Sequence, residues 1–187
     1  HTEMTASEFD YHADIANGPV TVRTIHSIGP FVRKQKDIEL TAHNGIILPS
    51  VEKDAVSVSV IERDGINQNH AHGFISGWSI KHGAIATTSA PDDNNMVVAG
   101  VSTADMALAA NTLLKSGGGQ VVVMDGQILS LLELPIAGIA TDLTPVELAA
   151  KENELKQKSI LLGCQLPDPL FYLSFLPITA IPDLAIT

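Results

Sequence analysis

The sequence predicts an α+β domain in which a mainly antiparallel sheet packs against two main helices. Three observations support this fold class. Short segments alternate apolar and polar residues, two longer segments place apolar residues at helical spacing, and Asp125-Gly126 forms a turn pair between two apolar segments. The 187 residues suit one large domain, and we find no repeat, low-complexity tract or linker that divides them. We therefore expect a single domain over residues 1–187.

The N-terminal part carries the strands with the clearest alternation. After an irregular lead-in of residues 1–19, the segment from Val20 to Ile28 alternates between apolar and polar side chains and is expected to form a strand. A short strand is expected at residues 38–41. In residues 56–60 the valines point one way and the serines the other. This pattern predicts an antiparallel strand with one face in water.

Both main helices have recognisable ends. The first begins after Ser102, whose side chain can cap the free backbone N–H groups, and it ends at the glycines of residues 117–119. The second begins after Thr144, with Glu147 three residues later as in a capping box, and ends at Gly163. The expected helices are therefore bounded by sequence signals at both ends.

The C-terminal half also contains a hairpin and an apolar tail. Asp125 and Gly126 supply the two positive-φ residues of a type I′ turn between strands expected at 121–124 and 127–134. Residues 168–187 are apolar and rich in proline. We expect this tail to pack on the domain as an extended coat.

Charge and cysteine content exclude several classes of protein. The chain has 11 basic and 21 acidic residues, a net charge of −10 that would repel nucleic acid over most of the surface. No stretch reaches about 18 consecutive apolar residues and the N-terminus is polar, so we expect neither a membrane span nor a signal peptide. Cys164 is the only cysteine, which favours a reducing cytoplasm. Since it follows a helix C-terminus, it is expected to be a packed thiol and not a nucleophile.

Two histidines form the first candidate for a metal site. His70 and His72 alternate on a strand, which places both imidazoles on one face. A metal ion needs further ligands, and the alternative is a pair of solvated histidines in a glycine-rich turn. The other nearby residues able to act as ligands are Asp64, His82, Asp92 and Asp93.

A polar loop is the second candidate site. Residues 89–95 join two apolar strands expected at 84–88 and 96–100, and such loops often carry function. Two carboxylates there could transfer protons or bind a metal, and two amides could hydrogen-bond a polar ligand. The alternative is an ordinary loop rich in Asx turns. The four side chains are Asp92, Asp93, Asn94 and Asn95.

Several segments, taken in order, resemble the C-terminal domain of bacterial adenine deaminases of the amidohydrolase superfamily. Their order and spacing match that family from about Ala6 to Thr187. The segments are Val60-Ile61-Glu62-Arg63, Gly73 to Ala86, Asp105 to Asn111, Gly117 to Val123, Leu134-Pro135-Ile136-Ala137-Gly138 and Leu173-Ser174-Phe175-Leu176.

The resemblance implies a hydrolase that converts adenine and water to hypoxanthine and ammonia. In that family a divalent metal (Mn, Fe or Zn) in a TIM-type barrel activates the water. The 187 residues have no room for that barrel, so the resemblance implies an accessory domain without independent catalysis. Its implied partners are the barrel, a purine base at the domain contact and further copies in a homo-oligomer. Asp92 and Asn95 would lie on a loop that faces the barrel.

The chain departs from the family pattern in two neighbouring segments. The family loop reads His-Asp-x-His-Asn, and here Pro91 and Asn94 stand at the histidine positions. Asp64 stands where the family places a histidine after Glu-Arg. Either these histidines act at the domain contact and this member has drifted, or it acts on another substrate. A non-catalytic binding or assembly module is the alternative function.

Overall fold

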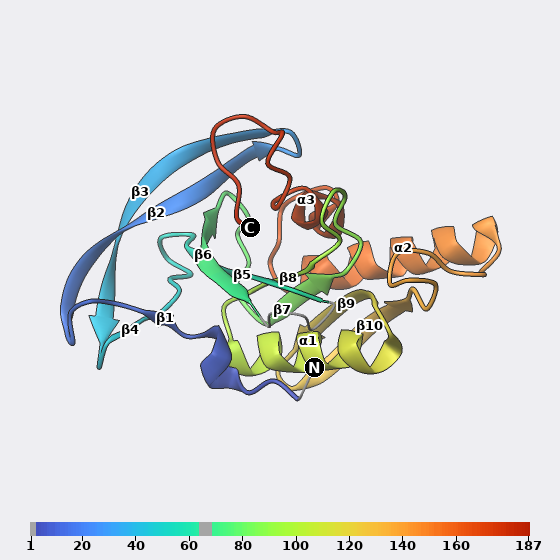
Figure 1. Cartoon of the computed structure of the whole chain (residues 1–187), viewed down its shortest axis with the longest axis horizontal. Helices are drawn as coiled ribbons and strands as arrows, with labels where there is room; N and C mark the ends of the chain where they lie inside the picture. Colours follow the sequence, from blue (N-terminus) through green and yellow to red (C-terminus); the bar gives the residue numbers. More distant parts are fainter. Residues whose placement is uncertain (1–2, 64–68) are drawn as a thin grey trace.

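The computed structural model describes residues 3–63 and 69–187. Within them, one ten-stranded mixed sheet lies between helices on both faces (Figure 1). Helix α1 (Thr103–Ser116) packs on one face, and α2 (Pro145–Leu161) and α3 (Pro169–Ser174) pack on the other. This arrangement confirms the predicted α+β class with a mostly antiparallel sheet.

The strand order across the sheet is β1-β4-β3-β2-β6-β5-β8-β7-β9-β10. All neighbours are antiparallel except β2 and β6, which run parallel. That parallel contact joins a long curved hairpin, β2–β3, to the rest of the sheet (Figure 1). The strands are β1 (Tyr11–His12), β2 (Gly18–Gly29), β3 (Val32–His43), β4 (Ile46–Ile47), β5 (Val56–Ile61), β6 (His70–Ser76), β7 (Ala84–Thr87), β8 (Met96–Gly100), β9 (Gly119–Met124) and β10 (Gln127–Glu133).

The predicted helix ends and the predicted turn are confirmed. The Ser102 hydroxyl accepts the N–H of Asp105 at 3.2 Å, and Gly117 ends α1 with a φ of 77°. Thr144 and Glu147 form the expected capping box of α2. The turn between β9 and β10 has φ values of 52° at Asp125 and 74° at Gly126. The capping residues and the turn pair therefore determine where these helices begin and end and where the hairpin turns.

The prediction of one wet face for residues 56–60 is wrong. Every residue of β5 is buried. Val56, Val58 and Val60 pack in the cluster that contains α2 and α3 residues, whereas Ile61 packs with α1. Because helices cover both faces of the sheet at its centre, the serines between the valines are buried too.

Both ends of the chain are more regular than expected. Within residues 1–19, a 3₁₀ helix (Ala6–Phe9) precedes β1, and the buried ring of Phe9 packs with α1 residues. The tail of residues 168–187 begins with α3 instead of an extended coat. Asp168 caps that helix by accepting the N–H of Phe171 at 3.3 Å.

A buried arginine ties the β2–β3 hairpin to the tail. Arg33 is 2% exposed, and its guanidinium donates to the carbonyl of Leu176 at 2.7 Å and to that of Ile178 at 3.2 Å. Burial lowers the pKa of Arg33. The bend of the hairpin is thus held against the C-terminal segment. Among the described residues, no helix is both long and apolar enough to cross a membrane.

Candidate functional site

The described loops that carry the predicted site residues meet at one end of the sheet. The backbone N–H of Arg63, after β5, donates to Oδ1 of Asn95 at 3.4 Å. Nη1 of Arg63 donates to the carbonyl of Ala137 at 2.6 Å, in the turn that follows β10. We call this region the loop edge and define it as Arg63, residues 88–95, residues 117–118 and residues 136–139.

Close packing fixes the loop edge. The hydroxyl of Thr88 donates to the carbonyl of Gly138 at 2.6 Å and accepts the N–H of Gly119 at 2.8 Å. A Cβ added at Gly138 would overlap Nη1 of Arg63, and one at Gly118 would overlap Cα of Gly138. Only glycine therefore lets these backbones and the guanidinium approach so closely.

The polar loop is an ordered Asx-rich turn. Asp93 accepts two hydrogen bonds from Asn95, one from its backbone N–H at 3.1 Å and one from Nδ2 at 3.0 Å. The N–H of Asn94 donates to the carbonyl of Ala90 at 2.8 Å, and Asp92 and Asn94 both have positive φ. Asp92 is exposed and accepts no hydrogen bond from the described residues. The loop thus presents one free carboxylate on a fixed backbone.

The two predicted loop residues therefore play different parts. Asn95 is occupied within the domain, since its amide joins Asp93 to Arg63. Asp92 is the residue of the pair that is free to meet a ligand or another protein surface. Sequence reasoning did not select Arg63 or Gly138, although both lie in segments that resemble the family.

The histidine pair lies in β6, on the other side of β5. Nδ1 of His72 hydrogen-bonds the hydroxyl of Ser59 at 2.9 Å, and the rings of His70 and His72 are 6.1 Å apart. Burial lowers the pKa of His72, with smaller contributions from His70 and His12. No group of three or more ligand side chains able to hold a metal occurs within the described residues. Asp64, one of the proposed ligands, lies outside them. The described residues therefore supply no third ligand beside this pair.

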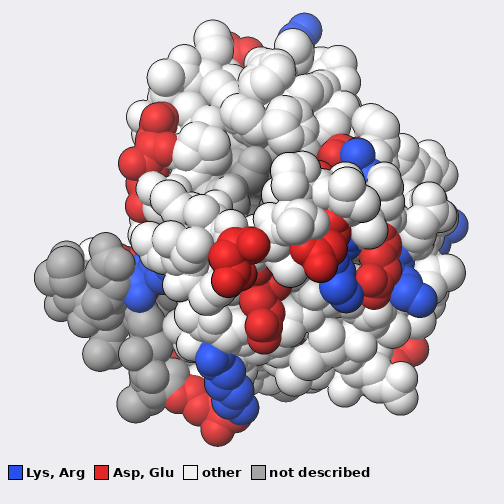
Figure 2. Space-filling view, turned by 90° about the vertical axis from the view of Figure 1, so that its right-hand side faces the viewer, with Lys and Arg blue, Asp and Glu red and all other residues white. Residues whose placement is uncertain are grey.

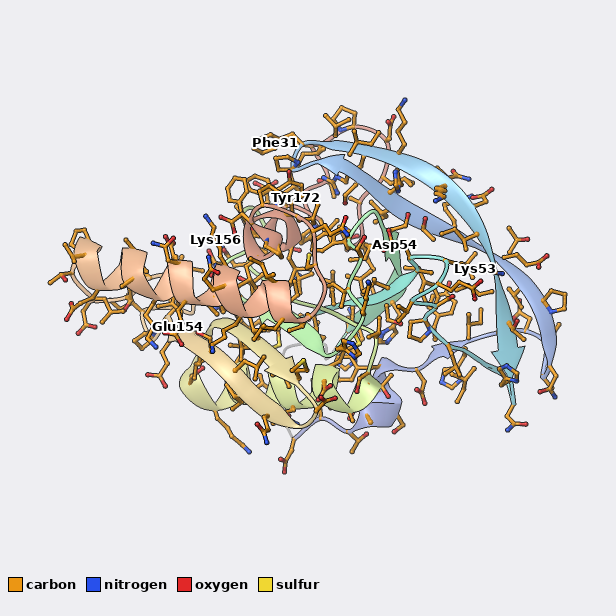
Figure 3. All side chains as sticks on the ribbon, turned by 180° about the vertical axis from the view of Figure 1, so that it is seen from behind. Phe31, Lys53, Asp54, Glu154, Lys156 and Tyr172 are labelled. Atoms are coloured by element: carbon orange, nitrogen blue, oxygen red, sulfur yellow. The ribbon has the colours of Figure 1, made fainter. Side chains whose placement is uncertain are left out.

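A hollow lies beside the loop, between the sheet and the two C-terminal helices. It measures about 390 Å³ and is lined by Ser89 and Pro91 on one side and by Phe171 and Phe175 on the other. At its rim Lys156 and Asp168 form an ion pair at 2.7 Å, and Figure 3 shows Lys156 near the helix that carries Tyr172. Large parts of the face in Figure 2 carry no charged side chain.

Comparison with known proteins gives the family. The family model described as the adenine deaminase C-terminal domain matches residues 30–187. This chain belongs to that family. The result confirms the resemblance found in the sequence.

Three curated relatives illustrate the relationship of this adenine deaminase C-terminal domain. "Adenine deaminase 1" of Latilactobacillus sakei is 56% identical over 184 residues, "Adenine deaminase 1" of Desulfotalea psychrophila 49% over 183, and "Adenine deaminase" of Moorella thermoacetica 37% over 185. Each match covers 98% of this chain but only 31% of the relative. The chain therefore spans less than a third of the length of each of these relatives.

Two of the residues at which the sequence departs from the family pattern, Pro91 and Asn94, lie at the loop edge. Pro91 and Asn94 lie in the loop that Asn95 joins to Arg63. Asp64 directly follows Arg63 in the sequence but falls outside the described residues. Two segments about thirty residues apart thus meet at one place, and the candidate site is a surface formed by both.

Proposed function

We propose that this chain is the accessory domain of an enzyme that hydrolyses adenine to hypoxanthine and ammonia. Two findings support this: membership of the adenine deaminase C-terminal domain family, and relatives named adenine deaminase of which the chain covers 31%. The catalytic part, with its divalent metal (Mn, Fe or Zn), would lie in the polypeptide outside these 187 residues.

The loop edge is the surface that we assign to the contact with the catalytic part. The observation that carries this is the hydrogen bond from Arg63 to Asn95, which holds the end of β5 against the loop that contains Pro91 and Asn94. On the same edge, Ile136 and Ile139 are 52% and 45% exposed. Exposed apolar side chains beside polar groups are typical of an interface, which has an apolar core and a polar rim.

Asp92 would help to close the purine site. A carboxylate accepts hydrogen bonds from N–H groups, and adenine offers both an amino group and a ring N–H. Held on a rigid loop, Asp92 could orient the base without a large entropy cost. Asn95 would act through the loop, since its own amide is already paired.

A chimeric enzyme tests this proposal. The chain would replace the corresponding C-terminal region of the Latilactobacillus sakei relative, and ammonia release from adenine would be measured. The chimera should be active and the isolated chain inactive. Asp92→Ala should lower kcat/KM more than tenfold. That corresponds to an increase of about 1.4 kcal/mol or more in the activation free energy. Asp142→Ala, an exposed carboxylate outside the loop edge, is the control. Wild-type kinetics for Asp92→Ala would remove the loop from the mechanism.

A binding or assembly module is the second candidate, and one observation favours it. Helix α2 exposes large apolar side chains, among them Val146 at 79% and Ile160 at 57%. Such residues could bury against another copy of the protein in a homo-oligomer. Sizing of the isolated chain at several concentrations would decide this, because a monomer at every concentration contradicts self-assembly.

The unpaired Cys164 supports a cytoplasmic location.

A further inference from the structure

Three phenylalanines form an apolar cluster where the hairpin bend meets α3. The rings of Phe31 and Phe175 are 4.8 Å apart, those of Phe171 and Phe175 are 4.7 Å apart, and all contacts are edge-on. Figure 3 shows Phe31 at the hairpin bend close to α3. We call Phe31, Phe171 and Phe175 the aromatic cap.

The aromatic cap remains accessible. Phe31 is 53% exposed and Phe171 is 43% exposed, and the neighbouring hairpin residues Ile28 and Val32 are 58% and 51% exposed. Aromatic side chains are enriched at the energetic centres of interfaces and are seldom gathered on a free surface. Four large apolar side chains around one bend therefore indicate a contact surface.

The aromatic cap is also rigid before any partner arrives. Arg33 lies two residues after Phe31, and its two hydrogen bonds to tail carbonyls fix the bend. The three rings brace one another across the hairpin and α3. A preorganised surface loses little conformational entropy when a partner binds.

The hollow links the aromatic cap to the loop edge. Its wall is formed by Phe171 and Phe175 on the cap side and by Ser89 and Pro91 on the loop side. Helix α3 packs against β7 and β8, the two strands that the loop joins. The aromatic cap, the hollow and the loop edge thus form one continuous surface.

We propose that the aromatic cap is the second half of the surface on which the catalytic part docks, with a segment of that part that carries both apolar and polar side chains filling the hollow. This rests on the proposed function. The remaining length of the relatives supplies a polypeptide that could cover this face, and continuity with the loop edge favours this face over others. Burial of the cap would remove apolar surface from water, which favours association.

Radical footprinting of the chimera tests the docking surface. Labelling of Phe31 and Phe171 would be compared between the chimera and the isolated chain, with Ile128 on the opposite edge strand, 47% exposed, as the control. We expect labelling of both phenylalanines to fall at least fivefold in the chimera, with Ile128 unchanged. Equal labelling of the cap in the two proteins would overturn the proposal.

Two further outcomes keep this proposal apart from the proposed function. If the cap is labelled equally but the chimera still deaminates adenine, the docking surface is wrong and the proposed function stands. If protection appears in the isolated chain as its concentration rises, a second copy covers the cap and our assignment fails. Phe171→Ser should restore labelling of Phe31 in the chimera, while the same variant of the isolated chain keeps its wild-type far-ultraviolet dichroism.

Discussion

Asp93 accepts two hydrogen bonds from Asn95, one at each of its carboxylate oxygens. The backbone N–H of Asn95 donates to Oδ1 and its side-chain Nδ2 donates to Oδ2. The pair sets the shape of the loop that presents Asp92. Because Asn95 also accepts from Arg63, the Asp93 carboxylate indirectly fixes the distance between two segments of the loop edge.

Asp93→Ala should therefore loosen the loop without unfolding the domain. Both lost bonds are exposed, so the free energy of unfolding should fall by less than about 1 kcal/mol. If the loop helps to close the purine site, kcat/KM of the chimera should fall severalfold. Urea titration of the isolated chain and an adenine assay of the chimera check the two expectations. A variant with normal kinetics would show that loop geometry is irrelevant to turnover.

Asn111→Ala should destabilise the domain more than any exposed substitution on α1. The side chain accepts the backbone N–H of Met4 at 2.8 Å and donates to its carbonyl at 2.8 Å, in a buried position. Loss of two buried hydrogen bonds should lower the free energy of unfolding by about 2 kcal/mol. Lys115→Ala, which removes an exposed ion pair with Glu3, should change it by less than about 0.5 kcal/mol. Equal urea midpoints for the two variants would contradict this account.

His72 should make the domain less stable in acid. Burial, with smaller contributions from His70 and His12, lowers the pKa of His72 in the folded state. The unfolded chain therefore binds a proton first as pH falls, and stability should decrease below about pH 6.5. His72→Gln should reduce that slope in urea titrations between pH 5 and pH 8. A slope unchanged in the variant would assign the acid sensitivity to other groups.

Cys164 should make the domain less stable in base. Burial raises the pKa of its thiol to about 11 from an ordinary value of 9.0. The folded state keeps its proton while the unfolded chain loses it, so stability should fall as pH rises from about 9 to about 11. Two units correspond to a loss on the order of 2–3 kcal/mol.

The matching control for Cys164 is Cys164→Ala, which should show a flatter stability profile above pH 9. In the native protein at pH 8, the thiol should also resist alkylation by iodoacetamide and react once urea unfolds the chain. Rapid alkylation of the folded protein would mean that the Cys164 side chain is accessible to solvent. The burial that raises the pKa of its thiol would then be absent.

Local signals predicted the local structure of this chain well. The caps at Ser102 and Thr144 and the turn at Asp125-Gly126 are confirmed, because each depends on hydrogen bonds within a few residues. The segment before Gly18 and the tail after Asp168 were predicted less well. Their regular parts depend on packing against α1 and against β7 and β8, which no local pattern records.

The candidate site could be predicted only in pieces. Asp92 and Asn95 lie in a loop, as the sequence predicts, and their role in a site stays a prediction. The contact between Asn95 and Arg63 spans 32 positions, so no local periodicity in the sequence indicates it. The same is true of Thr88 and Gly138, which lie 50 positions apart. The burial of Ser59 followed from helices on both faces of the sheet, whereas alternation along β5 alone suggested exposure.

The position of β2 sets a limit on how this fold can be cut. The family match starts at residue 30, yet β2 ends at Gly29 and is the only strand that joins β3 to β6 among the described residues. A gene fragment that begins at the family boundary would lose β2. The sheet would then be divided into two parts, each with an exposed strand edge whose backbone N–H and C=O groups are unpaired. Such a fragment should collect in inclusion bodies, and anyone expressing the domain should begin upstream of β2.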